Sequence, residues 1–188
     1  MPERTIIHIY GASGSGTTTI GNALAQRYGF RQMDTDDYFW LPTDPPFCRK
    51  REREQRLLLM RRELEQGGKI VITGSLCGWG DPLTEYFDLA VRVETPAEVR
   101  LQRIRQRESL RFGDRIREGG DMAQAHQAFV AWAAAYDTGD ESMRSLKLHR
   151  LWEKTLPCPH ITVSGEQPAE KSAEEILRYL HDDAAAES

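Results

Sequence analysis

The sequence has no long apolar run and few cysteines. Its 188 residues are 39% hydrophobic and 29% charged, and no segment approaches the ~20 consecutive apolar residues that a transmembrane helix needs. Cys48, Cys77 and Cys158 are odd in number, far apart, and lack the close pairing of a zinc site. The N-terminus shows no secretory signal pattern. We therefore expect a cytoplasmic protein with no membrane span, no disulfide framework and no structural zinc.

The chain also lacks an overall positive charge. Its 25 basic and 29 acidic residues give a formal net charge of −4, which disfavours a nucleic-acid partner. Positive charge is instead concentrated in residues 49–62 and 100–117, each with seven basic and two acidic side chains. Such local clusters indicate small anionic ligands rather than a long polyanion. The sequence leaves the oligomeric state open.

Strand-like and helix-like segments alternate along the chain, which predicts an α/β fold. Strands are predicted at 5–10, 30–33, 69–73, 87–93 and 161–163, and helices at about 18–28, 52–66, from 96 onward, 122–136, 143–154 and 173–180. No internal repeat or linker divides the sequence, so we expect one domain over 1–188. This pattern predicts three layers, with a mostly parallel five-stranded sheet between helices and with ligands at the carboxyl ends of the strands.

The strongest motif is Gly-Ala-Ser-Gly-Ser-Gly-Thr-Thr at residues 11–18, between the first predicted strand and helix. It fits the P-loop pattern, in which glycines let successive backbone N–H groups point inward and the helix N-terminus adds its positive dipole end. The motif predicts binding of a nucleotide such as ATP, with the Thr18 hydroxyl as a Mg²⁺ ligand. The predicted nucleotide-binding residues are Gly11, Ala12, Ser13, Gly14, Ser15, Gly16, Thr17, Thr18 and Thr19. A purely structural glycine turn is the alternative.

One position departs from the motif, because Thr17 stands where the pattern has lysine. Phosphoryl transfer needs positive charge near the γ-phosphate, so a catalyst with this loop requires another cation. The arginines of residues 100–117 are the candidates. Over about ten residues the loop resembles the variant P-loop of some archaeal cytidylate kinases.

Three carboxylates, Asp34, Asp36 and Asp37, follow the second predicted strand. Here the chain resembles the shikimate kinase and nucleoside monophosphate kinase families, in which acidic residues at this place order Mg²⁺ waters or grip the acceptor. The resemblance implies that Asp34 or Asp36 holds metal-bound water, orients the acceptor hydroxyl or acts as a base, with Thr18 and Asp36 as the metal residues. A turn and helix cap is the alternative.

Four arginines, Arg100, Arg103, Arg107 and Arg111, follow at spacings of three, four and four, and Arg115 lies beyond Gly113. This segment is similar to the lid of the nucleoside monophosphate kinases, and the resemblance implies a lid over about 107–120. Arg107, Arg111 and Arg115 are then the expected charge-stabilising residues, with Asp36 as the fourth catalytic residue. The alternative is a solvated helix face.

The resemblance to these kinase families also implies that the acceptor binds at the insertion over about 36–66 and at the turn after the third strand. Predicted substrate-binding residues are Asp34, Asp37, Arg49, Arg53, Gly74, Ser75 and Trp79. We expect Arg49, Arg53 and Arg56 to share one side of a helix and to bind an anionic acceptor. A solvated amphipathic helix is equally compatible with this pattern.

Taken together, the motifs predict an ATP-binding, Mg²⁺-dependent phosphotransferase that moves the γ-phosphoryl group to a small-molecule or nucleotide acceptor. The main alternative is a nucleotide-binding switch or assembly ATPase with weak hydrolysis and a protein partner, which the missing lysine makes credible. A binder of nucleotides without chemistry is the third possibility.

Overall fold

The computed structural model describes residues 4–186. Its five strands form one sheet, in the order β2-β3-β1-β4-β5, and every neighbouring pair is parallel. The strands are β1 (Thr5–Gly11), β2 (Arg31–Asp34), β3 (Lys69–Thr73), β4 (Leu89–Glu94) and β5 (His160–Ser164). The predicted parallel α/β fold is confirmed.

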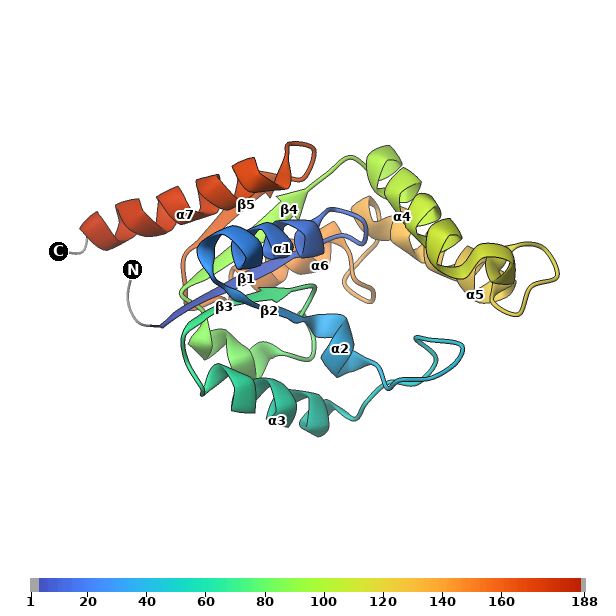
Figure 1. Ribbon diagram of the computed structural model, residues 1–188, viewed down its shortest axis with the longest axis horizontal. Coiled ribbons are helices and arrows are strands. Elements are labelled where there is room, and N and C mark those ends of the chain that lie inside the picture. Colours follow the sequence, from blue (N-terminus) through green and yellow to red (C-terminus); the bar gives the residue numbers. More distant parts are fainter. Residues whose placement is uncertain (1–3, 187–188) are drawn as a thin grey trace.

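Helices cover both faces of the sheet, because its central strands carry apolar side chains on both sides. On one face, Ile7 and Ile9 of β1 share a core with α1 (Thr17–Tyr28) and α7 (Ala169–Ala186). On the other, Ile6 and Tyr10 of β1 contribute to a second core, which is completed by α3 (Arg53–Leu64), the 3₁₀ helix η1 (Asp81–Tyr86) and α6 (Leu146–Glu153). Figure 1 shows these layers, with α1 and α7 above the strands and α3 below.

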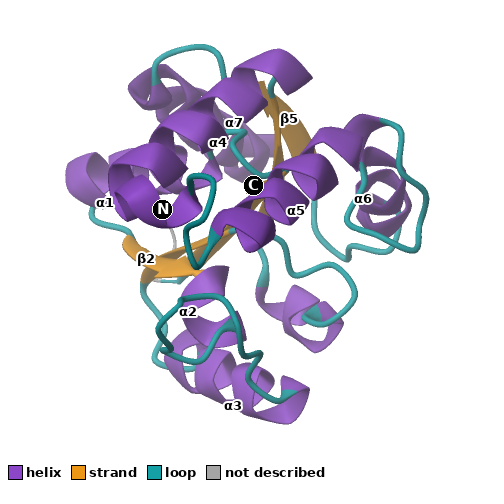
Figure 2. Ribbon diagram, turned by 90° about the vertical axis from the view of Figure 1, so that its right-hand side faces the viewer, coloured by secondary structure: helices purple, strands orange, loops and turns teal. Residues whose placement is uncertain are grey.

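A helical segment extends beyond the carboxyl ends of the strands. It consists of α4 (Ala97–Phe112), the 3₁₀ helix η2 (Gly113–Ile116), α5 (Ala123–Ala134) and the 3₁₀ helix η3 (Ala135–Asp137), and it lies at the right of Figure 1. In the rotated view of Figure 2, α2 (Thr35–Phe39) and α3 lie below β2, and α4 and α5 lie above it. The carboxyl ends of the strands, called the open sheet edge below, therefore lie between the two groups of helices.

Two local features differ from the sequence expectation. Residues 35–39 form the short helix α2, which was not among the predicted helices. The Asp34 carboxylate caps its first turn by accepting from the Asp36 N–H, so the helix cap given above as the alternative for this cluster is present. The next segment is a narrow arm, residues 40–50, whose ends are joined by an antiparallel bridge between Trp40 and Lys50. Arg49 therefore lies in the arm and not on α3, so the expected helical face of Arg49, Arg53 and Arg56 is wrong.

Within residues 4–186, no helix is both long enough and apolar enough to cross a membrane.

Candidate functional site

The glycine loop joins β1 to α1 at the centre of the open sheet edge. Gly14 and Gly16 adopt left-handed backbone angles, with φ of 79° and 107°, and Gly16 directly precedes the first turn of α1. A Cβ atom on Gly14 would stand 2.6 Å from the Arg100 carbonyl oxygen, a backbone atom that cannot swing away. The loop therefore requires glycine at this position for both conformation and space.

Asp34 faces the start of α1 across the sheet edge. Its Oδ2 accepts a hydrogen bond of 3.1 Å from the Thr18 hydroxyl and a longer one of 3.4 Å from the Thr73 hydroxyl. Its Oδ1 accepts the Asp36 N–H at 3.0 Å. Because Mg²⁺ prefers hard oxygen ligands, the Thr18 hydroxyl and the Asp34 carboxylate are a suitable pair of donors beside the phosphate loop. The contact of Thr18 is with Asp34, the other acidic candidate, and not with Asp36.

Asp36 lies two residues further along, in the first turn of α2, and faces a different set of groups. Burial by surrounding protein and the Asp34 charge raise the pKa of its carboxyl, while Arg144 and Arg107 act in the opposite direction. The Asp36 side chain itself is exposed to solvent. Arg107 therefore acts on Asp36 through its charge, and its side chain pairs with Glu108 at 3.6 Å.

Arg144 is a site residue that the sequence interpretation missed. It precedes α6 in the loop after η3, with its guanidinium carbon 5.3 Å from the centroid of the Trp132 ring. Burial lowers the pKa of Arg144, and the Asp36 charge partly offsets that shift. The isolated arginine in the sequence segment 138–146 gave no motif, and only the tertiary fold lets its charge act on Asp36.

Of the first two arginines of α4, only Arg103 contacts the phosphate loop with its side chain. Arg100 is 1% exposed, donates to the Thr95 carbonyl oxygen at 2.9 Å and pairs with Asp137 at 2.5 Å. Arg103 donates to the carbonyl oxygens of Gly165, at 2.9 Å, and Ser15, at 3.4 Å. Arg103 is therefore held against the loop, whereas sequence reasoning emphasised the later arginines.

Arg111 and Arg115 lie further out, where α4 and η2 meet the arm. The Arg111 guanidinium carbon is 4.9 Å from the Phe47 ring centroid, and Arg115 pairs with Asp44 at 2.8 Å and Asp121 at 2.7 Å. These two carboxylates raise the pKa of Arg115. In this arrangement both guanidinium groups join the lid segment to the arm and do not reach the acidic corner.

Substituting Asp44 by asparagine should loosen the arm from the lid segment without unfolding the protein. The ion pair between Asp44 and Arg115 is exposed and contributes little to global stability. It does, however, join the arm to the segment that carries Arg115. Reaction of the exposed Cys48 thiol with a thiol reagent should accelerate severalfold, with an unchanged melting temperature. Asp114→Asn, which removes the 2.6 Å ion pair with Arg117 inside the lid segment, should leave the Cys48 rate unchanged. Equal Cys48 rates in Asp44→Asn and the wild type would contradict the contact.

The predicted acceptor residues divide into open and buried groups. Asp37, Arg49 and Arg53 are exposed, and Gly74 is half-buried at the end of β3. Ser75 and Trp79 are 3% and 7% exposed, and both side chains point into the protein interior. Trp79 donates its indole N–H to the Ser75 carbonyl oxygen at 3.1 Å. The side chains of Ser75 and Trp79 therefore support the turn from beneath, and the exposed candidates for acceptor binding are Asp37, Arg49 and Arg53.

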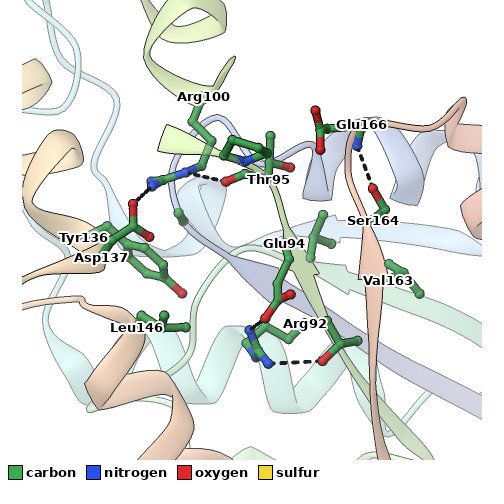
Figure 3. Close-up of a pocket in the computed structure, with 14 residues that line it drawn as sticks. Arg92, Glu94, Thr95, Arg100, Tyr136, Asp137, Leu146, Val163, Ser164 and Glu166 are labelled. Carbon is green, nitrogen blue, oxygen red and sulfur yellow. Dashed lines mark hydrogen bonds and ion pairs between the residues drawn. The ribbon is translucent and has the colours of Figure 1, made fainter. Parts of the chain in front are cut away.

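A cavity of about 590 Å³ lies beside the loop at the carboxyl ends of β4 and β5. Figure 3 shows Arg100 on one side of it and Arg92 at its base. Arg92 pairs with Glu94 and Glu153, and Arg100 pairs with Asp137. Because carboxylates already pair with both arginines, the cavity is less suited to a phosphate group than the glycine loop.

Comparisons with known proteins agree with this site. A family model described as an AAA domain matches residues 7–123. A cytidylate kinase from Pyrococcus horikoshii is 30% identical over 121 residues, covering 58% of this chain and 62% of the relative. Shikimate kinase 2 from Serratia proteamaculans is 30% identical over 109 residues, covering 53% of the chain and 63% of the relative. The chain belongs to the P-loop small-molecule kinase superfamily.

Two further matches cover nearly the whole chain. An uncharacterized protein, YqaC of Bacillus subtilis, is 38% identical over 174 residues, covering 93% of the chain and 96% of the relative. Among solved structures, a shikimate kinase from Bacteroides thetaiotaomicron superposes with a TM-score of 0.59 at 17% identity, covering 94% of the chain and 98% of that structure. At this identity the structural likeness establishes the fold alone.

Proposed function

We propose that this P-loop kinase transfers the γ-phosphoryl group of ATP to a hydroxyl or phosphate group of a small anionic acceptor. The observation that carries the proposal is the position of Asp34, whose carboxylate accepts from the Thr18 hydroxyl at the mouth of the glycine loop. The names of the relatives, cytidylate kinase and shikimate kinase, support the reaction class and leave the acceptor open.

In this proposal the residues have separate roles. The amides of residues 13–16 and the start of α1 bind the phosphates. Thr18 and Asp34 would hold Mg²⁺, which supplies charge neutralisation of the phosphates when bound. Asp36 would lie next to the acceptor and orient its hydroxyl. Its raised pKa makes it a better proton acceptor than an ordinary aspartate.

Positive charge for the transition state then comes from the arginines that surround the loop. Arg103 is held at the phosphate loop by its two carbonyl contacts, and the charge of Arg107, on the same helix, acts on Asp36. We propose these two as the groups that replace the missing lysine. Arg111 and Arg115 would take part only after the contacts with the arm are rearranged.

Arg144 is our candidate for the acceptor's anionic group. Replacing it by glutamine should raise the KM for the acceptor by roughly 10- to 100-fold, since a charge-assisted hydrogen bond contributes about 1.5–3 kcal/mol. The KM for ATP should change less than threefold. Arg150→Gln on α6, an exposed position, serves as the control and should behave like the wild type. An unchanged acceptor KM in Arg144→Gln would remove Arg144 from the site.

A coupled assay of ADP release tests the function itself. The purified protein is given ATP and Mg²⁺ with cytidylate, adenylate, shikimate or gluconate, each against a reaction without acceptor. The proposal predicts that at least one acceptor accelerates ADP release, that chelation of Mg²⁺ stops it, and that Thr18→Ala lowers it strongly. ADP release that responds to no acceptor would favour the switch or assembly ATPase, an alternative that Thr17 in the lysine position supports.

A further inference from the structure

Two buried histidines approach the turn at the end of β3 from beneath. The His8 Nε2 atom is 2.8 Å from the Gly74 carbonyl oxygen, and the His149 Nε2 atom is 3.0 Å from the Ser75 hydroxyl. Both histidines are 0% exposed. They belong to β1 and α6, which are far apart in the sequence, so the contact with one dipeptide turn arises only in the folded chain.

A third group fixes the direction of His149. The Tyr136 hydroxyl lies 2.8 Å from His149 Nδ1, so both ring nitrogens of His149 are engaged. Tyr136 itself packs beneath Arg100, whose guanidinium carbon is 5.1 Å from the tyrosine ring centroid. Buried contacts therefore connect the turn, through His149 of α6 and Tyr136, to Arg100 near the start of α4.

The protonation states follow from burial. Desolvation lowers the pKa of His8 to about 4 and that of His149 to about 3, so both rings are neutral near pH 7. A carbonyl oxygen only accepts, so the His8 proton is on Nε2 and is donated to Gly74. Neutral His149 carries one proton, so it donates to one of its two hydroxyl partners and accepts from the other.

From these contacts we infer that His8 and His149 are positioning residues, which hold the Gly74–Ser75 turn at the height where it meets the acceptor. The inference rests on the proposed function for its kinetic consequence. Its structural basis is independent of that function, because the hydrogen bonds define the turn whether or not an acceptor is bound. Neither histidine is exposed to solvent, so neither contacts an acceptor directly.

Side-chain geometry allows a test that separates positioning from packing. A glutamine amide reaches about as far as a histidine Nε2, and an asparagine amide about as far as Nδ1. His149→Gln therefore retains the contact with Ser75, whereas His149→Asn loses it. Tyr136→Phe leaves the ring in place but removes the hydroxyl that orients His149. Tyr10→Phe is the matched control, because its buried hydroxyl bonds Glu153 at 2.8 Å and not the turn.

Two properties are measured on all four full-length variants. The first is amide hydrogen exchange over residues 74–80. The second is the pair of KM values, for ATP and for whichever acceptor, cytidylate or shikimate, supports turnover. His149→Asn should exchange about tenfold faster in this segment and raise the acceptor KM about tenfold, as expected for one lost hydrogen bond to the turn. His149→Gln, Tyr136→Phe and Tyr10→Phe keep the contact with Ser75 and should stay within about twofold of the wild type, and the KM for ATP should stay constant throughout.

If His149→Asn does not fold, Ser75→Ala, which removes the hydroxyl that His149 contacts, takes its place. Wild-type exchange at residues 74–80 in the variant that loses this contact would overturn the inference, and so would equal losses in His149→Gln and His149→Asn. A wild type without acceptor-dependent ADP release would defeat the proposed function instead, while the exchange measurement would still decide the role of His149.

Discussion

Asp34→Asn should lower acceptor-dependent ADP release by on the order of a hundredfold or more, because it removes the only carboxylate in contact with Thr18 among residues 4–186. Asparagine keeps an oxygen that can accept the Asp36 N–H, so α2 and the fold should persist. The measurement is kcat over a range of Mg²⁺ concentrations, with circular dichroism to verify folding.

The control for this substitution is Asp182→Asn, which removes the same charge from an exposed position of α7. It should leave both kcat and the Mg²⁺ dependence unchanged. An Asp34→Asn enzyme within threefold of the wild type at saturating Mg²⁺ would show that Asp34 has no part in the reaction.

The second large effect concerns stability in acid. The folded pKa values of His8 and His149, about 4 and about 3, lie below the ordinary value near 6.5 of an unfolded chain. The unfolded chain therefore binds more protons as the pH falls below about 6.5, and folding free energy is lost until the folded pKa is reached. For His8 alone the loss amounts to about 3 kcal/mol.

Urea unfolding between pH 7 and pH 4.5 measures this loss. Below pH 6 the two histidines together should give a slope approaching about 2.7 kcal/mol per pH unit. His149→Gln should reduce the slope by roughly half, since one titrating group is gone. The raised pKa of Asp36 acts in the opposite direction, but it is common to both proteins and cancels in the comparison. Identical slopes in the two proteins would mean that His149 is not buried as a neutral ring.

Local patterns predicted the fold and the phosphate loop well, for a physical reason. The apolar segments of β1 and β3 and the glycine pattern of residues 11–16 each act over a few neighbouring residues, so their structure follows from sequence spacing alone. The acidic corner was also predictable, because Asp34 ends a strand and the carboxyl ends of parallel strands meet at one edge.

The remaining parts depend on contacts between distant segments. Arg144 lies in no motif, and its charge acts on Asp36 only because of where the loop before α6 lies in the fold. The spacing of Arg103, Arg107 and Arg111 identified a helical face, but not that Arg103 contacts the glycine loop and Arg111 the arm. Ser75 looked like a substrate contact, and its engagement by His149 required knowledge of which helix covers that turn.

Calorimetric titration of ATP with Mg²⁺ into the wild type and Gly14→Ala tests the central claim, that the glycine loop binds a nucleotide triphosphate. The wild type should bind one ATP per chain, and Gly14→Ala should bind none detectably, because its Cβ would lie 2.6 Å from the Arg100 carbonyl oxygen. Gly29→Ala carries a similar left-handed strain, with φ of 72° and no neighbour within 4 Å of the new Cβ, and should bind ATP like the wild type. A folded wild type that gives no binding heat at millimolar ATP, or a Gly14→Ala variant that binds equally tightly, would contradict the account.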